Sequence, residues 1–290
     1  MDAIKHIGFG CVGLSTCNTQ KAALRVLETA YDNGITHFDT APIYGKGFSE
    51  KILSVFLKNK RDKITLATKV GLFTNPVNMP AWAALPLNAI IKKVKGSAYP
   101  KISFEQAQIM QARAIEKHDI QNSIAESMIR LGVEKLDHLL LHEALPHFLS
   151  DDASDYLFSL KQQGIVSKLG IAASAVNIET LKSSDIENWD VLQYENAVQY
   201  QSDNFINAFP DQEHIYHSIF KTLLLLDKQK IDMHQAPGIL MARSYLNNPN
   251  GKVLFSTTNI VHLKQNIRVF EEYVKLPKTE VENIVNHAIS

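Results

Sequence analysis

Residues 34–45 read Gly-Ile-Thr-His-Phe-Asp-Thr-Ala-Pro-Ile-Tyr-Gly. The short run at 36–39 is bounded by glycine and proline and is too apolar to be half-exposed, so we interpret it as a strand buried on both faces. The run ends at Asp39, and Tyr44 follows five positions later. Two reactive side chains therefore leave the same end of one predicted strand.

Seven other short apolar runs share the length and the polar or glycine boundaries of this one. Longer amphipathic stretches, which we expect to be helices, separate several of them. About eight strand–helix alternations without a clear linker predict an α/β protein with a (β/α)8 TIM barrel and a single domain spanning residues 1–290. The candidate strands are residues 7–10, 36–39, 64–69, 136–142, 168–172, 191–194, 214–218 and 253–256, and the candidate helices are 19–33, 119–131, 151–163, 177–182 (with Asn177 as its N-cap) and 260–270.

The bulk composition excludes several classes of function. Thirty basic and thirty acidic side chains give a formal net charge of zero, which is not the electrostatic footprint of a nucleic-acid or anionic-membrane binder. Cys11 and Cys17 are too few for a disulfide framework and do not have the spacing of a zinc site, so we expect no metal. Without a signal-like N-terminus or a membrane-length apolar run, we expect a soluble cytoplasmic protein. The oligomeric state is left open.

A long interval, residues 72–110, follows the third candidate strand. A loop of this length is usually functional or disordered. In a barrel, the segment after a strand lies at the C-terminal face, where active sites are built. We interpret it as part of a substrate lid or wall, with Phe73, Trp82 and Tyr99 as aromatic lining. A solvent-exposed insertion with its own short helix explains the sequence equally well.

Ionisable residues end several of these apolar strands. Asp39 ends the second, Lys69 the third and His142 the fourth, while Tyr44 follows the second. Taken singly, each has a structural explanation, such as a turn former, a snorkelling lysine or a buried core histidine. A charged group at the end of an apolar strand costs free energy unless it is paired, and neighbouring strands of one barrel bring all four to one mouth.

The four side chains are suited to proton donation. A free phenol has a pKa near 10 and is a poor acid at neutral pH. A lysine ammonium beside its oxygen would lower that pKa, and a carboxylate would keep the lysine charged and in place. A neutral imidazole could orient a carbonyl oxygen. This set equips a site for carbonyl reduction, in which the hydride comes from a cofactor.

The surrounding motifs closely resemble those of the aldo-keto reductase family. Residues 34–45, continued by Ser49-Glu50, resemble its signature, and residues 67–71 (Ala-Thr-Lys-Val-Gly) resemble its lysine strand. Residues 126–133 and 137–142 resemble the helix and strand that lead to its histidine, and the similarity runs from about residue 7 to 267. It implies that Tyr44 is the general acid/base, that Lys69 and Asp39 tune it, and that His142 orients an aldehyde, ketone, sugar-like carbonyl or alcohol substrate. It also implies NADPH, or less often NADH, bound across the barrel mouth.

The cofactor positions follow the family pattern only in part. Where the family usually has Gly-Val-Ser-Asn, with Ser and Asn holding the nicotinamide carboxamide, this chain has Gly-Ile-Ala-Ala at 170–173, and Ser174 or Asn177 could substitute. Gln193 keeps the expected glutamine. Either Tyr216 or His217 would stack on the nicotinamide ring, and the spacing favours His217. The remaining positions that the resemblance assigns to the cofactor are Ser218, Ser256, Thr257, Thr258, His262, Gln265 and Asn266.

Two of these features leave the cofactor and the function open. His262 stands where an arginine often grips the 2′-phosphate of NADPH, so the preference for NADPH over NADH rests on family habit. Residues 256–259 could also be no more than an N-capping turn before the last predicted helix. The paired alanines at 172 and 173 support a second interpretation, a catalytically weak or inactive family member that binds nicotinamide cofactors as a regulatory or sensor protein.

Overall fold

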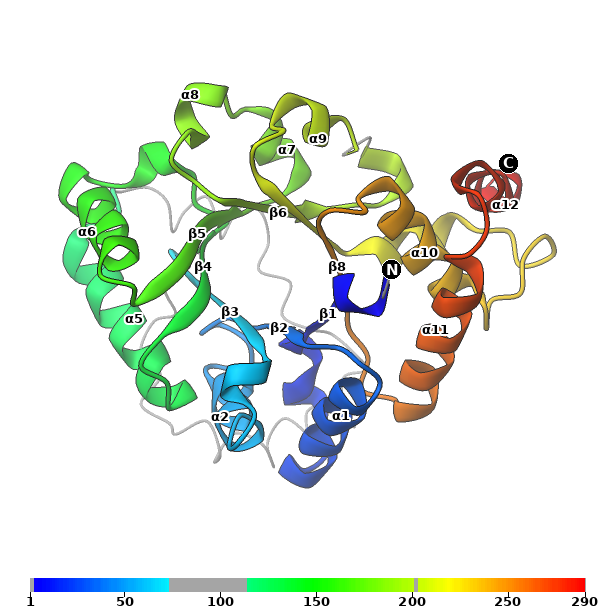
Figure 1. Ribbon diagram of the computed structural model, residues 1–290, viewed down its shortest axis with the longest axis horizontal. Coiled ribbons are helices and arrows are strands. Elements are labelled where there is room, and N and C mark those ends of the chain that lie inside the picture. The colour runs from blue at the N-terminus through cyan, green and yellow to red at the C-terminus, as the bar shows by residue number, and fades with distance from the viewer. Residues whose placement is uncertain (1–2, 73–113, 201–202, 290) are drawn as a thin grey trace, which may run out of the picture.

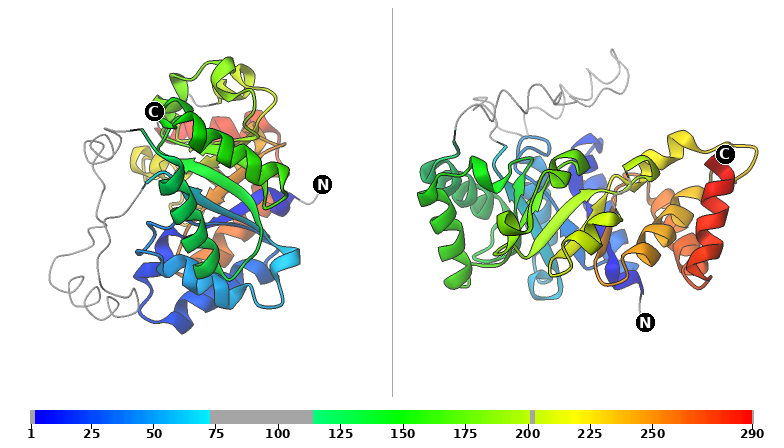
Figure 2. Two further views of the ribbon diagram at one scale, coloured as in Figure 1. Left: turned by 90° about the vertical axis from the view of Figure 1, so that its left-hand side faces the viewer. Right: turned by 90° about the horizontal axis from the view of Figure 1, so that it is seen from above.

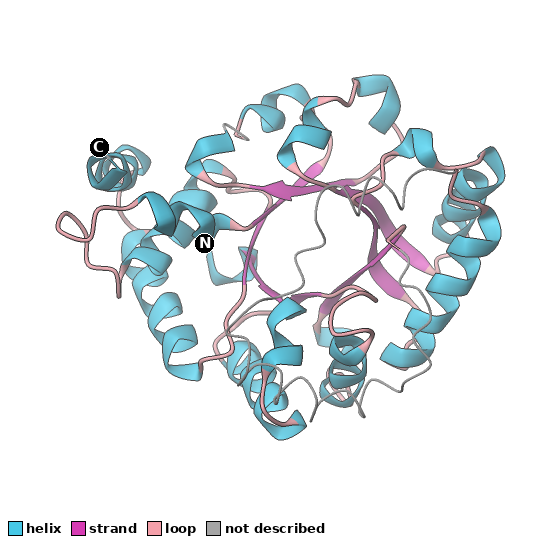
Figure 3. Ribbon diagram, turned by 180° about the vertical axis from the view of Figure 1, so that it is seen from behind, coloured by secondary structure: helices cyan, strands magenta, loops and turns pink. Residues whose placement is uncertain are grey.

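The computed structural model describes residues 3–72, 114–200 and 203–289. Nearly all of the predicted substrate wall, including Phe73, Trp82 and Tyr99, lies outside the described residues. Within them, eight parallel strands pair in chain order and close into a barrel, because β1 pairs with β8. Figure 1 looks along this barrel, and Figure 3 shows from behind that the strands enclose the centre while the helices form the outer ring. The predicted (β/α)8 fold is confirmed.

All eight predicted strands are present, with ends that shift by at most two residues. Ser218 and Ser256 lie just past the strands to which the sequence assigned them. Ser218 leaves the ladder because its backbone turns into the left-handed region (φ 56°). The strands are β1 Ile7–Gly10, β2 His37–Asp39, β3 Thr65–Val70, β4 Leu136–His142, β5 Val166–Ala172, β6 Val191–Glu195, β7 Glu213–His217 and β8 Lys252–Phe255.

Four of the five predicted helices begin and end close to where the sequence placed them. The fourth is corrected, because its N-cap is Ser174 and not Asn177: the Ser174 hydroxyl accepts a hydrogen bond from the Asn177 amide (3.4 Å). The α-helices are α1 Gln20–Asp32, α2 Phe48–Phe56, α5 Lys117–Leu131, α6 Asp151–Gln162, α7 Ala175–Glu179, α8 Ser183–Ile186, α9 Asn204–Ala208, α10 Ala236–Asn247, α11 Ile260–Tyr273 and α12 Lys278–Ile289. The 3-10 turns are η1 Ala3–His6, η2 Cys11–Thr16, η3 Arg61–Lys63, η5 Pro146–Phe148, η6 Val198–Tyr200 and η7 Ile219–Leu225.

The core has two parts that together decide which side chains reach the barrel mouth. A large core lies between the strands and the surrounding helices, and a small cluster that includes Leu140 and Ile215 fills the barrel interior. Strand residues two positions apart point to the same side. His142 lies two residues beyond Leu140, and His217 two beyond Ile215, so both face the C-terminal mouth.

The last helix, α12, packs against α10 on the outside of the ring (Figures 1 and 2). It adds a further layer next to the barrel and ends at Ile289, the last residue that the structure describes. No helix in the described parts of the chain combines the length and the apolar character that a bilayer crossing requires.

Candidate active site

Tyr44 is presented by a tight turn between β2 and α2. The three residues after it all have left-handed backbones, with φ of 60° at Gly45, 55° at Lys46 and 83° at Gly47. A Cβ at Gly45 would lie 2.5 Å from the Cβ of Ser15, so only glycine fits there. The turn therefore fixes where the phenol of Tyr44 leaves the backbone.

Lys69 is buried at the mouth and held by two oxygens. Its Nζ donates to Asp39 Oδ1 (2.5 Å) and to the carbonyl oxygen of Thr40 (3.0 Å). Lys69 and Asp39 are each only 3% exposed, so the pair is an ion pair shielded from solvent screening. The ammonium also lies 5.3 Å from the centroid of the Tyr44 ring. Three of the four predicted catalytic residues are thus in one contact set.

The phenol of Tyr44 is a weaker acid here than in water. Burial raises its pKa above the ordinary value of 10, and although the charge and hydrogen bonding of Lys69 lower it, Asp39 raises it further. Lys69 lowers the pKa of Tyr44, as expected from the sequence, but desolvation of the phenolate outweighs that effect and the net shift is upward. Tyr44 is therefore protonated at neutral pH. Burial lowers the pKa of Lys69, but Asp39 and Tyr44 raise it and the net shift is upward, so Lys69 stays charged.

His142 completes the group. Its ring centroid lies 6.0 Å from that of Tyr44, with the two planes at 90°. Burial, Lys69 and His217 together hold the pKa of His142 well below its usual range. The imidazole is therefore neutral at physiological pH, as the sequence suggested, and it carries one N–H that can donate to an oxygen beside Tyr44.

Gln193 joins this group from β6. Its Nε2 donates to Asp39 Oδ2 (3.1 Å), on the oxygen that Lys69 does not use. Gln193 is 2% exposed, and its Oε1 has no hydrogen-bond partner in the part of the chain that the structure describes. A buried carbonyl oxygen without a partner is costly, so this atom marks a place suited to an N–H donor.

Of the two aromatic candidates on β7, only His217 reaches the mouth. Tyr216 is fully buried on the outer side of the strand, and its hydroxyl donates to Asp203 Oδ1 (2.9 Å). His217 instead faces inward, with its Nδ1 2.9 Å from the hydroxyl of Ser218. Burial, with smaller contributions from Lys69 and Lys221, lowers the pKa of His217 to about 3. It presents a flat, neutral ring at the end of β7.

The other predicted cofactor residues lie beyond β8, near the start of α11. Ser256 and Thr258 lie against the loop after β1, since a Cβ at Gly13 would be 3.3 Å from each of them. Thr257 accepts from the Asn259 amide (3.2 Å), and the Asn259 side chain caps α11. The capping-turn interpretation of residues 256–259 is therefore confirmed, and it leaves a role in cofactor binding open.

The predicted residues on α11 itself are not equally placed for a ligand. His262 is exposed on the first turn, whereas Asn266 is only 5% exposed and belongs to the buried side of the helix. Gln265 is already used, because its Nε2 donates to the carbonyl oxygen of His234 (3.0 Å). In the described structure, none of the three has a contact with the group around Tyr44.

The buried ion pair between Glu50 and Arg130 was not predicted from the sequence, although both residues lie in motifs that resemble the family. Glu50 on α2 is fully buried and accepts from Arg130 Nε (2.6 Å) and from the hydroxyl of Thr68 (2.9 Å). Thr68 precedes Lys69 on β3. The pair therefore fixes α2 and α5 against the strand that carries the lysine.

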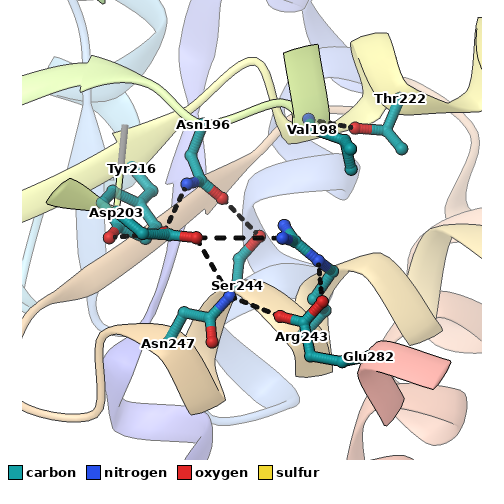
Figure 4. Close-up of polar contacts among 9 residues, drawn as sticks. All are labelled: Asn196, Val198, Asp203, Tyr216, Thr222, Arg243, Ser244, Asn247 and Glu282. Carbon is teal, nitrogen blue, oxygen red and sulfur yellow. Dashed lines mark hydrogen bonds and ion pairs between the residues drawn. The ribbon is translucent and has the colours of Figure 1, made fainter. Parts of the chain in front are cut away.

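A second polar network joins the segment after β6 to β7 and α10, and Figure 4 shows it. Asp203 Oδ1 accepts from Asn196 Nδ2 and from the Tyr216 hydroxyl (both 2.9 Å), while its Oδ2 accepts from Asn247 Nδ2 (3.2 Å). Arg243 lies 3.8 Å from the same oxygen. Because Arg243 and Asn247 also bind Glu282 on α12, the last helix is linked through α10 to the segment after β6 (Figure 4).

Two cavities, of about 320 and 500 Å³, lie at the opposite, N-terminal end of β5 to β7. None of the predicted catalytic or cofactor residues lines either of them. Within the described residues, no cluster of histidine, cysteine and carboxylate side chains could hold a metal ion. The chemistry that the residues carry is therefore concentrated at the C-terminal mouth.

An α/β barrel that gathers an aspartate, a tyrosine, a lysine and a histidine at its C-terminal mouth is the class of protein that the fold and site define. The chain belongs to the aldo/keto reductase family, whose model matches residues 6–201. The resemblance noted in the sequence is thereby confirmed.

Among curated proteins, D-threo-aldose 1-dehydrogenase from a Pseudomonas species is 32% identical over 180 residues, which cover 59% of this chain and 50% of that protein. An uncharacterized oxidoreductase of Bacillus subtilis, YqkF, is 27% identical over 185 residues, which cover 63% of this chain and 50% of YqkF. The chain thus spans about half the length of these relatives.

Solved structures match the fold over nearly the whole chain. An aldo-keto reductase from Bacillus halodurans, in its holo form, has a TM-score of 0.66 at 16% identity and covers 98% of this chain and 93% of its own. An aldo-keto reductase from Klebsiella pneumoniae in complex with NADPH has a TM-score of 0.66 at 17% identity, covering 98% and 91%. At such identities these matches support the barrel architecture and nothing finer.

Proposed function

We propose that the protein is an NAD(P)H-dependent oxidoreductase that reduces an aldehyde, ketone or sugar-like carbonyl to an alcohol, or catalyses the reverse reaction. The observation that carries this proposal is the buried contact set of Asp39, Lys69 and Tyr44, with the neutral His142 perpendicular to the phenol. Membership of the aldo/keto reductase family supports it.

Each of these side chains has a distinct part in the reaction. His142 donates its N–H to the carbonyl oxygen and orients it towards Tyr44. The phenol, protonated at neutral pH, gives its proton to that oxygen as negative charge develops. Lys69 then stabilises the phenolate, and Asp39 keeps the ammonium in place. A bound nicotinamide cofactor supplies or accepts the hydride.

The residues at the mouth fit such a cofactor. The unpartnered Oε1 of Gln193 is an acceptor for an amide N–H, and His217 offers a flat neutral ring beside it. The hydroxyl of Ser256 and the methyl group of Thr258 lie against the backbone of Gly13, which leaves one hydroxyl beside a narrow backbone surface. We propose NADPH as the cofactor because the family usually binds it, and NADH is the alternative because an exposed histidine, His262, stands where an arginine often holds the 2′-phosphate.

The substrate class and the location belong to the same proposal. The Pseudomonas relative is named as an aldose dehydrogenase, which supports a sugar-like carbonyl among the substrates. We propose a small-molecule carbonyl or alcohol as the partner, no nucleic acid, and a cytoplasmic location.

One observation favours a second candidate function, a nicotinamide-binding sensor with weak or no turnover. β5 ends at Ala172 and Ala173 follows it, so neither position has a polar side chain where the family usually provides a serine and an asparagine. A cofactor held less firmly would be poorly placed for hydride transfer.

A titration followed by an assay separates the two functions. NADPH and NADH are titrated against the protein by fluorescence, and then a panel of aldehydes, ketones and aldoses is assayed with the wild type and with Tyr44→Phe. Turnover that falls about 100-fold or more in Tyr44→Phe, with cofactor affinity unchanged, is the expected result. Cofactor binding without turnover on any substrate would favour the sensor, and undiminished turnover in Tyr44→Phe would refute the proton-donor role.

A further inference from the structure

Glu143 is a strained residue at the mouth to which the sequence analysis assigned no role. It follows His142 directly, and its backbone is left-handed (φ 53°) although it is not a glycine. Such a conformation costs free energy and is often retained for function. Its amide donates to the carbonyl oxygen of Ala172 (2.7 Å), which places Glu143 at the end of β5.

The side chain of Glu143 reaches the residues that follow the two alanines. Its Oε2 accepts from the Ser174 amide (3.0 Å) and from Asn177 Nδ2 (3.5 Å). Ala172 is 4% exposed and Ala173 is fully buried, so neither offers a polar group at this end of the strand. The carboxylate therefore supplies hydrogen-bond acceptors where the strand itself has none.

Gln193 lies on the adjoining strand at the same level. Ala173 donates its amide to the carbonyl oxygen of Gln193 (3.0 Å), so the two residues are direct neighbours across β5 and β6. Among the described residues, Gln193 Oε1 lacks a partner. Two acceptors of different origin, a carboxylate and an amide oxygen, thus flank the alanine pair.

The charges around Glu143 suit a neutral amide donor better than an anion. Burial raises the pKa of Glu143, and the nearby Glu195 raises it further, whereas Ser174, Asn177 and Lys221 lower it. Lys221 is itself paired with Glu195. A second anion brought to this place would face two carboxylates and one lysine.

A nicotinamide carboxamide presents two N–H donors on one nitrogen. We propose that Glu143 accepts one of them while Gln193 Oε1 accepts the other, so that Glu143 replaces the polar side chains that positions 172 and 173 do not provide. This assignment rests on the proposed function, because it requires a nicotinamide cofactor at the mouth. It makes Glu143 a cofactor-positioning residue that retains the ring in a chain with alanines at these two positions.

Binding of three dinucleotide probes tests the assignment without turnover. The probes are NADPH, its 3-acetylpyridine analogue, in which a methyl group replaces the amino group, and 2′-phospho-ADP-ribose, which has no nicotinamide. Wild type should prefer NADPH over the acetylpyridine analogue. Glu143→Ala should lower that preference about tenfold (about 1.4 kcal/mol) and leave the affinity for 2′-phospho-ADP-ribose unchanged.

Two further variants sharpen the result. The nicotinic acid analogue of NADPH carries a carboxylate in place of the amide, so wild type should bind it weakly and Glu143→Gln should bind it several-fold better. Glu195→Gln is the matched control, since it removes a neighbouring carboxylate that is paired with Lys221, and it should keep the wild-type preference for NADPH.

An unchanged preference in Glu143→Ala would overturn the proposal. So would an equal loss of affinity for NADPH and 2′-phospho-ADP-ribose, because that outcome would mean that Glu143 only caps the loop. If the wild type bound no dinucleotide at all, the proposed function itself would fail, and the two failures are therefore distinguishable.

Discussion

The amide of Gln193 donates to the free oxygen of Asp39 across 3.1 Å, although the two residues are 154 positions apart in the sequence. Asp39 is thereby held from two sides, by Lys69 on one oxygen and by Gln193 on the other. Since Gln193 also carries the unpartnered Oε1 at the mouth, one side chain links the proton-transfer group to the expected place of the cofactor.

Replacing Gln193 by methionine should impair both stability and turnover. The substitution removes a hydrogen bond to a charged acceptor, a contact of about 1.5–3 kcal/mol, so we expect Tm to fall by several degrees, and because Asp39 is then held by Lys69 without Gln193, we expect kcat to fall about tenfold or more. Gln193→Glu, which places a carboxylate against Asp39, should be worse than methionine. Steady-state kinetics at saturating cofactor checks both variants, and an unchanged kcat in Gln193→Met would contradict the prediction.

The raised pKa of Tyr44 predicts opposite pH profiles for the two directions of the reaction. Reduction needs the protonated phenol, so its rate should stay level through the neutral range and fall only above about pH 10. Oxidation needs the phenolate and should rise with pH over the same range. Because Lys69 lowers the pKa of Tyr44, Lys69→Met should move the alkaline limb to still higher pH. Rates measured from pH 6 to 11 in both directions test this, and a limb near neutral pH would count against it.

We expect the protein to lose stability in mild acid because His37 and His138 are buried histidines with lowered pKa values. His37 is 1% exposed, and neither ring nitrogen has a partner in the described structure; its ring lies 5.4 Å from that of His138. Burial holds the pKa of His37 well below its usual range, and His138, Lys252, Lys69 and Lys168 add to the effect; burial also lowers the pKa of His138.

The direction in which stability changes with pH follows from proton uptake on unfolding. Below the ordinary pKa of about 6.5, the unfolded chain binds protons at these histidines and the folded chain does not, so stability is full above about pH 7 and declines as the pH falls. Each such histidine contributes up to about 1.4 kcal/mol per pH unit until its folded pKa is reached. Thermal denaturation from pH 8 to 5 should show a shallower slope for His37→Leu, and parallel curves would refute the assignment.

Removing Arg130 should destabilise the protein strongly. Arg130→Met leaves the fully buried Glu50 without its cation, and breaking a buried ion pair in this way costs about 3–5 kcal/mol. The double variant Glu50→Gln with Arg130→Met should recover part of that loss, because no charge is left buried. Chemical denaturation measures the three free energies of unfolding, and a double variant less stable than Arg130→Met would be the contrary outcome.

The strands and the catalytic group could be predicted from the sequence because their signals are local. Each strand is a short apolar run; Asp39 and His142 end β2 and β4, and Lys69 is the last residue but one of β3. Five of the described helices, α2, α8, α9, α10 and α12, were not predicted, and two of them show why. The α10 sequence is buried on nearly every side, so it shows no polar face, and α2 is a short helix that begins immediately after the left-handed turn that follows Tyr44.

The features that the sequence did not reveal depend on closure of the barrel or on backbone conformation. The contact between Gln193 and Asp39 exists only because β2 and β6 face one interior. The position of Glu143 follows from a left-handed turn that a non-glycine residue rarely adopts. Ser174 and Asn177 are both good N-cap residues, and the structure alone shows that Ser174 is the cap.

Closure of the ring between β1 and β8 also sets an order of events during synthesis. All four proposed catalytic residues are made by position 142, yet β1 has its second neighbour only after residues 252–255 have left the ribosome. Asp203 is likewise made before its ion-pair partner Arg243, and Arg243 before its own partner Glu282. A nascent chain therefore carries its reactive side chains long before it has the scaffold that aligns them, because the barrel can close only after β8 is made.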